Sequence, residues 1–140
     1  MKKWKIAGIF LVLALALPGC NIYPQETGLR NGCYTAQMSE QTKGWREYVV
    51  ITVKNGEIVT TEYNAENTAG FIKSWDNTYM SNMKAGTGTY PNEYTRYYAA
   101  QLTGHQEVPE IELLAGATHS GGNFKRLAEA AVQQALKGDS

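Results

Sequence analysis

Residues 32–64 contain three short runs of β-prone residues, and these runs predict β-strands. A short β-prone segment covers Gly32–Gln37, and β-branched residues dominate 48–54 and 57–64. Asn55-Gly56 separates the last two runs, and this dipeptide signals a hairpin because both positions of a type I′ turn need φ > 0. We therefore expect an antiparallel meander, in which one strand is followed by a hairpin.

The second half of the chain carries helical spacing. Pro91 opens a predicted helix that ends near residue 103, because a first turn does not need the N–H that proline lacks. In the last and clearest helix, Ser120 or Asn123 is the expected N-cap and Gly138 lies at the expected end. Apolar residues recur there at the spacing of an α-helix, namely Phe124, Leu127, Ala128, Ala131, Val132, Ala135 and Leu136.

The segment between the strands and these helices gives weaker signals. Residues 64–76 are predicted to be an irregular polar connection, 77–83 a short helix, and 84–90 a loop rich in Gly and Thr. Together, the elements predict an α+β fold in which an antiparallel twisted sheet packs with two main helices.

The N-terminal segment has the three parts of a bacterial export signal. Three lysines precede an apolar run over 6–17, which at roughly 12 residues is too short to span a bilayer and suits a signal peptide. The next residues, Leu17-Pro18-Gly19-Cys20, resemble a lipobox, whose cysteine is lipidated and becomes the mature N-terminus. The alternative is a secreted protein that is cut nearby and keeps Cys20 as a free thiol.

The export signal divides the chain into three parts. We expect residues 1–20 to be a lipoprotein signal peptide, 21–30 a tether, and 31–140 one folded domain at the extracytoplasmic side of a bacterial cell membrane. Removing the signal leaves 10 basic against 13 acidic residues, a net charge of −3. This charge argues against a nucleic-acid partner and against electrostatic adhesion to anionic lipid.

Small residues and glycines surround a hydroxyl near the start of the last helix. Gly116 and Ala117 lead into Thr118, and Gly121 and Gly122 follow. A helix N-terminus leaves its first N–H groups unpaired and suits an anion, and each glycine inside a helix costs about 1 kcal/mol, which indicates a steric need. On physical grounds alone, phosphate binding and plain helix capping explain this segment equally well.

A known flavin-attachment motif resembles the segment from Glu112 to Thr118. In the FMN-binding domain family this motif reads Asp, two residues, Ser or Thr, Gly, Ala, then Thr or Ser. The family includes flavin subunits of the sodium-pumping quinone reductase and of Rnf complexes, and small lipoproteins that carry electrons outside the membrane. In these proteins a transferase joins FMN to the final hydroxyl by a phosphoester bond, and that residue corresponds here to Thr118.

The resemblance extends over most of the mature chain, from about residue 31 to residue 136. Glu112 stands where the motif has Asp, and Ala115 stands where it has Ser or Thr. These departures make FMN binding better supported than covalent attachment. The other matching pieces are residues 31–36, Trp45, residues 53–58, Asp76, Tyr79, Asn82, Met83, Gly88 and Pro91.

The resemblance implies a cofactor site made of the motif and part of the middle segment. Tyr79, Met80, Met83 and Tyr90 would form an apolar wall for the flavin ring, with Met83 favoured by the resemblance, although such a stripe also fits plain core. His119 would bond the phosphate or tune the flavin, and otherwise faces solvent. The full set of expected FMN contacts is Gly116, Ala117, Thr118, His119, Ser120, Glu112, Met83 and Tyr79.

The function implied by the resemblance is electron transfer by a membrane-tethered flavoprotein rather than turnover by an enzyme. Its partners would be flavin, a flavin transferase, redox proteins, and the membrane through the lipid anchor. Two other interpretations remain: a non-redox lipoprotein that binds another ligand or a protein, and a flavin reductase. Cys33, the cysteine left after lipidation, is either a small apolar residue of the first strand or a reactive thiol.

Overall fold

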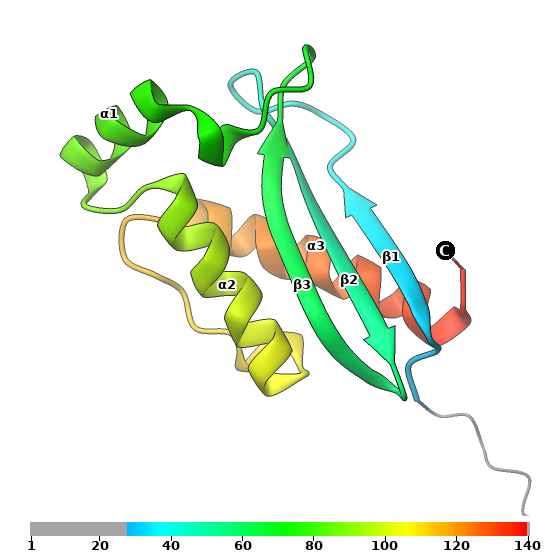
Figure 1. The fold of residues 1–140 in the computed structure, drawn as a ribbon. Helices are drawn as coiled ribbons and strands as arrows, with labels where there is room; N and C mark the ends of the chain where they lie inside the picture. Colours follow the sequence, from blue (N-terminus) through cyan, green and yellow to red (C-terminus); the bar gives the residue numbers. More distant parts are fainter. Residues whose placement is uncertain (1–27, 140) are drawn as a thin grey trace, which may run out of the picture.

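Three antiparallel strands form a sheet in the order β1-β2-β3 in the computed structural model, which describes residues 28–139 (Figure 1). The strands are β1 (Gly32–Gln37), β2 (Arg46–Lys54) and β3 (Glu57–Glu66). Asn55 and Gly56 join β2 to β3 with φ values of 53° and 76°, as a type I′ turn requires. The predicted meander is therefore confirmed, with the hairpin strands about two residues longer at their outer ends.

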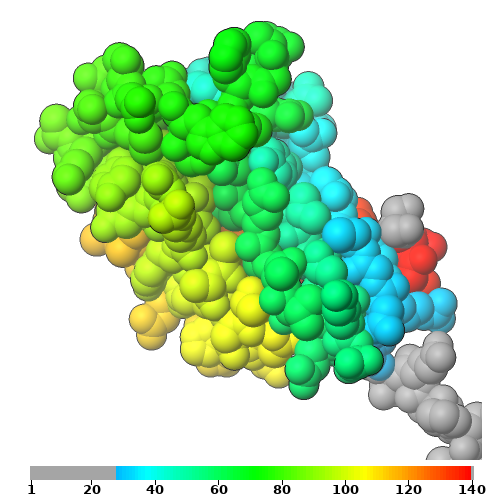
Figure 2. Space-filling view, viewed as in Figure 1, coloured from blue at the N-terminus to red at the C-terminus, as the bar shows by residue number. Residues whose placement is uncertain are grey.

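One face of this sheet carries the core. Along β2, Glu47, Val49, Ile51 and Val53 are buried, and the residues between them are less buried. Helix α2 (Pro91–His105) packs on β3, while α3 (Thr118–Lys137) packs on β1 and β2. On the side away from α3, the strands reach the molecular surface (Figure 2). This arrangement confirms the predicted α+β fold, in which two main helices cover an antiparallel sheet.

A third helix, α1 (Asn77–Thr87), precedes α2 and is longer than the sequence indicates. The Asp76 carboxylate caps it by accepting from the Tyr79 N–H at 2.9 Å. The prediction of a loop over 84–87 is wrong, because Lys84 and Ala85 favour a helix and the helix continues until Gly88 adopts a left-handed conformation. Two short 3₁₀-helices, η1 (Lys73–Trp75) and η2 (Val108–Glu110), lie before α1 and after α2.

The start of α3 also differs from the sequence expectation. The helix begins at Thr118 with Ala117 as its N-cap, and no side chain caps it. Ser120 and Asn123 therefore lie inside the first turns of the helix. The prediction that one of them is the N-cap is wrong. Both are buried, because this end of α3 packs against β2, where Glu47 accepts from the Asn123 amide, and the Tyr63 side chain of β3 reaches the Ser120 carbonyl.

Aromatic side chains hold α2, α3 and β3 together at the end of the core below this helix start. Tyr63 lies 5.0 Å from Phe124 between ring centroids, and Tyr98 stacks on Phe124 at 5.6 Å. All three side chains are at most 2% exposed. Burial raises the pKa of Tyr98, so its hydroxyl stays protonated and can donate a hydrogen bond.

Candidate functional site

A pocket of about 570 Å³ opens where the N-terminal end of α3, the start of β2, η1 and α1 meet. Its volume falls in the usual range for small-molecule sites, about 300–1,000 Å³. Seven of the eight residues that the sequence predicts as FMN contacts line it: Gly116, Ala117, Thr118, His119, Ser120, Met83 and Tyr79. Residues from distant parts of the chain, α1 and the start of α3, are therefore brought to one cavity.

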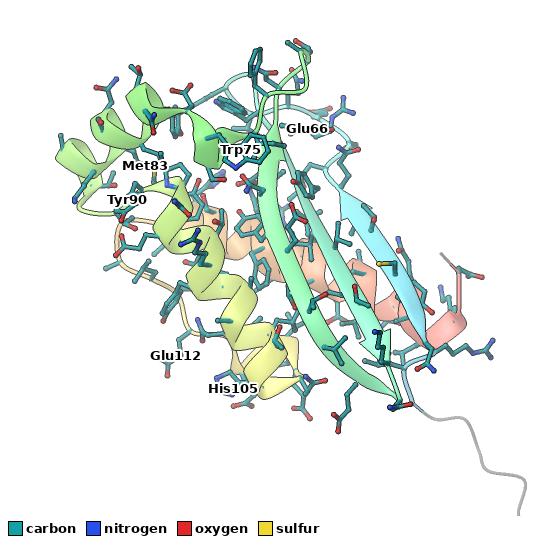
Figure 3. All side chains as sticks on the ribbon, viewed as in Figure 1. Glu66, Trp75, Met83, Tyr90, His105 and Glu112 are labelled. Atoms are coloured by element: carbon teal, nitrogen blue, oxygen red, sulfur yellow. The ribbon has the colours of Figure 1, made fainter. Side chains whose placement is uncertain are left out.

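The eighth predicted contact, Glu112, lies outside the pocket. Its side chain is exposed, and its backbone N–H and C=O are both bonded to the Gln101 side chain on α2, at 2.8 and 3.0 Å. Figure 3 shows Glu112 beside α2 and away from Met83 on α1. Its carboxylate is thus accessible to another protein rather than directed at a ligand in this pocket.

The N-terminus of α3 presents free hydrogen-bonding groups to the pocket. The first turn closes with the Gly121 N–H donating to the Ala117 carbonyl at 2.9 Å, so the helix leaves the N–H groups of Thr118, His119 and Ser120 unused. Thr118 is exposed, and within residues 28–139 no side chain or backbone group bonds its hydroxyl. A hydroxyl and several N–H donors therefore meet at one point, which suits an anion.

Tyr98 fixes the loop that leads into this helix. Its hydroxyl donates to the Ala117 carbonyl at 2.8 Å and accepts from the Leu114 N–H at 3.0 Å. In the same loop, Gly116 has a φ of 82°, and a Cβ on it would lie 2.4 Å from the Thr87 carbonyl oxygen at the end of α1. A contact within the protein therefore requires glycine at position 116. The sequence had instead indicated that a ligand approaches closely there.

A buried ammonium group also lines the pocket. Lys73, on η1, is 9% exposed, and its Nζ lies 4.7 Å from the centroid of the Tyr79 ring. Among the residues that the structure describes, no carboxylate lies close enough to form an ion pair with it. The pocket therefore holds a positive charge that is stabilised by an aromatic face but not neutralised.

The floor of the pocket is a buried polar cluster around Glu47. Its carboxylate accepts from the Asn123 amide and lies 2.8 Å from the Tyr63 hydroxyl, which also lies 2.9 Å from the Ser120 carbonyl. Burial, reinforced by the charge of Glu47, raises the pKa of Tyr63. Burial also raises the pKa of Tyr94, which lines the same cavity. Both phenols stay neutral, and the Tyr63 bonds tie β2, β3 and α3 together beneath the helix start.

Aromatic and thioether groups form another wall. Trp45, just before β2, meets Tyr79 edge-on with ring centroids 6.1 Å apart. Met83 follows Tyr79 by one helical turn on α1 and is half-buried. Met80 and Tyr90, which the sequence also placed in this wall, do not line the pocket. This wall is apolar and polarizable, so it suits a flat conjugated ring.

Several lining residues were not among the predicted contacts, namely Trp45, Glu47, Lys73, Tyr94 and Asn123. The sequence could have indicated two of them, because Glu47 and Asn123 are polar residues at positions whose periodicity points into the core. It could not have indicated Lys73, which lies in an irregular segment where no periodicity fixes the direction of a side chain.

The structure describes one of the two cysteines. Cys20 lies outside the described residues. Cys33 lies in β1 as expected, but it is exposed, and its Sγ is 3.3 Å from the Thr52 hydroxyl oxygen. The expectation that it packs as an apolar residue is wrong, because it falls on the sheet face that the helices leave uncovered. Within residues 28–139, no helix has both the length and the apolar content needed to cross a membrane.

The chain is similar in sequence to a lipoprotein, and similar in sequence and fold to two proteins of known structure. No protein-family model matches the chain. It is 29% identical over 130 residues to a 15 kDa lipoprotein of Treponema pallidum (strain Nichols), covering 92% of this chain and 89% of the relative. The crystal structure of the CPE2226 protein from Clostridium perfringens is 30% identical with a TM-score of 0.75, over 79% of this chain and 91% of that one.

A second solved structure has a similar fold. A protein from Clostridium thermocellum, determined by NMR in solution, is 27% identical with a TM-score of 0.54, over 76% of this chain and 92% of that one. The structures support the fold, and the lipoprotein relative supports lipid anchoring of the chain.

Proposed function

Because this chain belongs to the family of the Clostridium perfringens CPE2226 protein and has a lipoprotein as a relative, we propose that it is a lipid-anchored FMN-binding protein that carries electrons. It would receive electrons from one redox protein and pass them to another at the extracytoplasmic side of the membrane. Cys20 would be the lipidated residue. The name of the relative supports the anchor, and the pocket supports the cofactor.

The observation that carries the cofactor proposal is the set of groups in one pocket. A phosphate would be held by the free N–H groups and hydroxyl at Thr118, with the charge of Lys73 in the same cavity. A flavin ring would be held by the wall formed by Trp45, Tyr79 and Met83. The lining residues therefore fit both halves of FMN, whereas a capped helix alone would need neither the ammonium nor the aromatic wall.

The protein's part in this function is to bind, orient and shield. Bound FMN would supply the electron chemistry. Tyr98 keeps the phosphate-binding loop in one conformation, and the Glu47 cluster fixes the floor beneath it. These groups are held by buried hydrogen bonds, so little reorganisation is needed when a ligand enters.

The position of the pocket suits a tethered carrier. The Arg30 N–H, close to the start of the described chain, bonds the Ala135 carbonyl near the C-terminal end of α3. Thr118 lies at the other end of this helix, about 26 Å away at 1.5 Å per residue. In Figure 1 the two ends of α3 lie correspondingly far apart. The pocket would therefore face away from the tether and stay accessible to partner proteins.

A covalent phosphoester at Thr118 is the more specific form of this proposal. The Thr118 hydroxyl is exposed and unbonded among the described residues, as an acceptor for a modifying transferase must be. Glu112 is exposed six residues earlier, where that transferase can contact it. Non-covalent FMN would use the same pocket.

Titration of the purified protein with FMN and with riboflavin tests the proposal. We expect FMN to bind with quenching of its fluorescence, and riboflavin, which lacks the phosphate, to bind at least about tenfold more weakly, a difference of roughly 1.4 kcal/mol. The phosphate provides this difference because the N–H groups at the start of α3 have no anion to bind in riboflavin. Equal affinity for the two would contradict the phosphate site, and no binding of either would contradict the cofactor.

A second candidate, a non-redox lipoprotein that binds another protein, is favoured by two exposed aromatic residues. Phe71 is 68% exposed and Trp75, labelled in Figure 3, is 77% exposed. Large exposed aromatics are costly in water and often mark contact surfaces. The flavin titration separates the two candidates, because a protein-binding module without a cofactor would leave FMN fluorescence unchanged.

A further inference from the structure

The ammonium of Lys73 is buried without a counter-ion among the residues that the structure describes. The residue is nine-tenths buried, yet among residues 28–139 the Tyr79 ring is the only group that stabilises its charge. Burying a charge without a counter-ion is costly. An ammonium group buried in a pocket wall without a counter-ion points to a ligand whose negative charge it meets.

We propose that Lys73 favours the reduced form of the bound cofactor and thereby raises its midpoint potential; this rests on FMN being the ligand. When two electrons from a reduced redox protein and one proton from water enter the flavin ring, the ring gains one negative charge. Lys73 would stabilise that added charge across the cavity. Because Lys73 is buried, water and salt screen this attraction less than they would at an exposed lysine.

The other charged groups of the pocket cannot take this role. Lys43 and His119 line the same cavity but are both exposed, so solvent screens any charge that they carry. Arg126, beyond the lining, donates to the Asn123 amide oxygen at 2.5 Å. Glu47 is buried in the floor of the pocket, and its negative charge would act in the opposite direction, disfavouring the reduced form. The balance between Lys73 and Glu47 would therefore set the potential.

Charge-changing variants loaded with FMN test this assignment. The midpoint potential is measured by titration with dithionite, with absorbance as the readout. We expect Lys73→Met to lose at least tenfold of the preference for reduced over oxidised FMN, a shift of about 30 mV to more negative potential for a two-electron couple. Lys73→Arg keeps the charge and is expected to stay close to the unmodified protein.

Two further variants distinguish charge from a structural effect. Lys43→Met removes an exposed lysine of the same cavity and is expected to leave the potential unchanged. Glu47→Gln removes the opposing charge and is expected to move the potential in the positive direction, whereas a general loosening of the pocket would move both Lys73→Met and Glu47→Gln the same way.

The outcomes separate this inference from the proposed function. Bound FMN with the same potential in Lys73→Met and the unmodified protein would overturn the role of Lys73 and leave the cofactor in place. Equal shifts in Lys73→Met and Lys43→Met would also overturn it, because burial would then not matter. An unmodified protein that binds no FMN would overturn both proposals.

Discussion

The variant Thr118→Val is expected to lose covalent flavin completely while it keeps the fold. Valine has nearly the shape of threonine but no hydroxyl, so no phosphoester can form at this position. Thr118 is exposed at the first position of α3, and no group among residues 28–139 bonds its hydroxyl, so its loss leaves no buried partner unsatisfied. Intact-mass measurement after co-production with the flavin transferase gives the result.

The matched control for this variant is Thr118→Ser, which keeps the hydroxyl. We expect Thr118→Ser and the unmodified protein to gain the mass of FMN less one water, and Thr118→Val to show only the mass of the polypeptide. A flavin-sized mass on Thr118→Val would show that another residue is the acceptor. If the unmodified protein also lacks the added mass yet holds extractable FMN, the covalent form is wrong and the binding site stands.

The variant Gly121→Ala is expected to destabilise the protein, although alanine is the better helix former. A Cβ at Gly121 would lie 2.4 Å from the Tyr98 hydroxyl oxygen and 2.6 Å from Leu113 Cδ2. Tyr98 cannot easily withdraw, because it is fully buried and its hydroxyl holds the loop before α3 through two hydrogen bonds. We expect a loss of about 1–3 kcal/mol in the free energy of unfolding, measured in urea.

The neighbouring glycine provides the control for Gly121→Ala. A Cβ on Gly122 would meet no atom within 4 Å, so Gly122→Ala is expected to stabilise the protein by up to about 1 kcal/mol through helix propensity alone. The two variants make the same chemical change one residue apart and should have opposite signs. If both stabilise the protein, the close contact between α3 and Tyr98 is wrong.

These two glycines also show how far the sequence predicts the site. The sequence indicates a steric need for both glycines and assigns it to a ligand, which is correct in part for Gly121 and wrong for Gly122. The structure places Gly121 against Tyr98, a residue of α2, and leaves Gly122 without a contact. Helical periodicity cannot reveal this, because the contact depends on how two helices pack rather than on the pattern within one.

The fold is predicted well where local chemistry decides the structure. Asn55-Gly56 fixes the hairpin, Pro91 fixes the start of α2, and the apolar spacing fixes α3. Prediction is poorer where tertiary contacts decide it. Lys73 is brought into the pocket by a short 3₁₀-helix in an irregular segment, and Glu47 becomes a pocket residue because Asn123 and Tyr63 satisfy its carboxylate.

The candidate site was predicted in part by the residues near Thr118 and in part by Tyr79 and Met83. The structure brings these groups into one pocket and places Glu112 outside it. The prediction is wrong for Glu112 because a motif defines a continuous stretch of chain, whereas a pocket is lined only by the residues that face it. Glu112 belongs to the segment, but its backbone is fixed to Gln101 on the outer side of α2.

The absorbance spectrum of the lipoprotein, purified from the membranes of a bacterium that makes both it and its flavin transferase, tests the central claim most directly. The account predicts the two visible and near-ultraviolet bands of an oxidised flavin, close to one flavin per polypeptide, with bleaching on addition of dithionite. A colourless protein that stays colourless after incubation with FMN would contradict it.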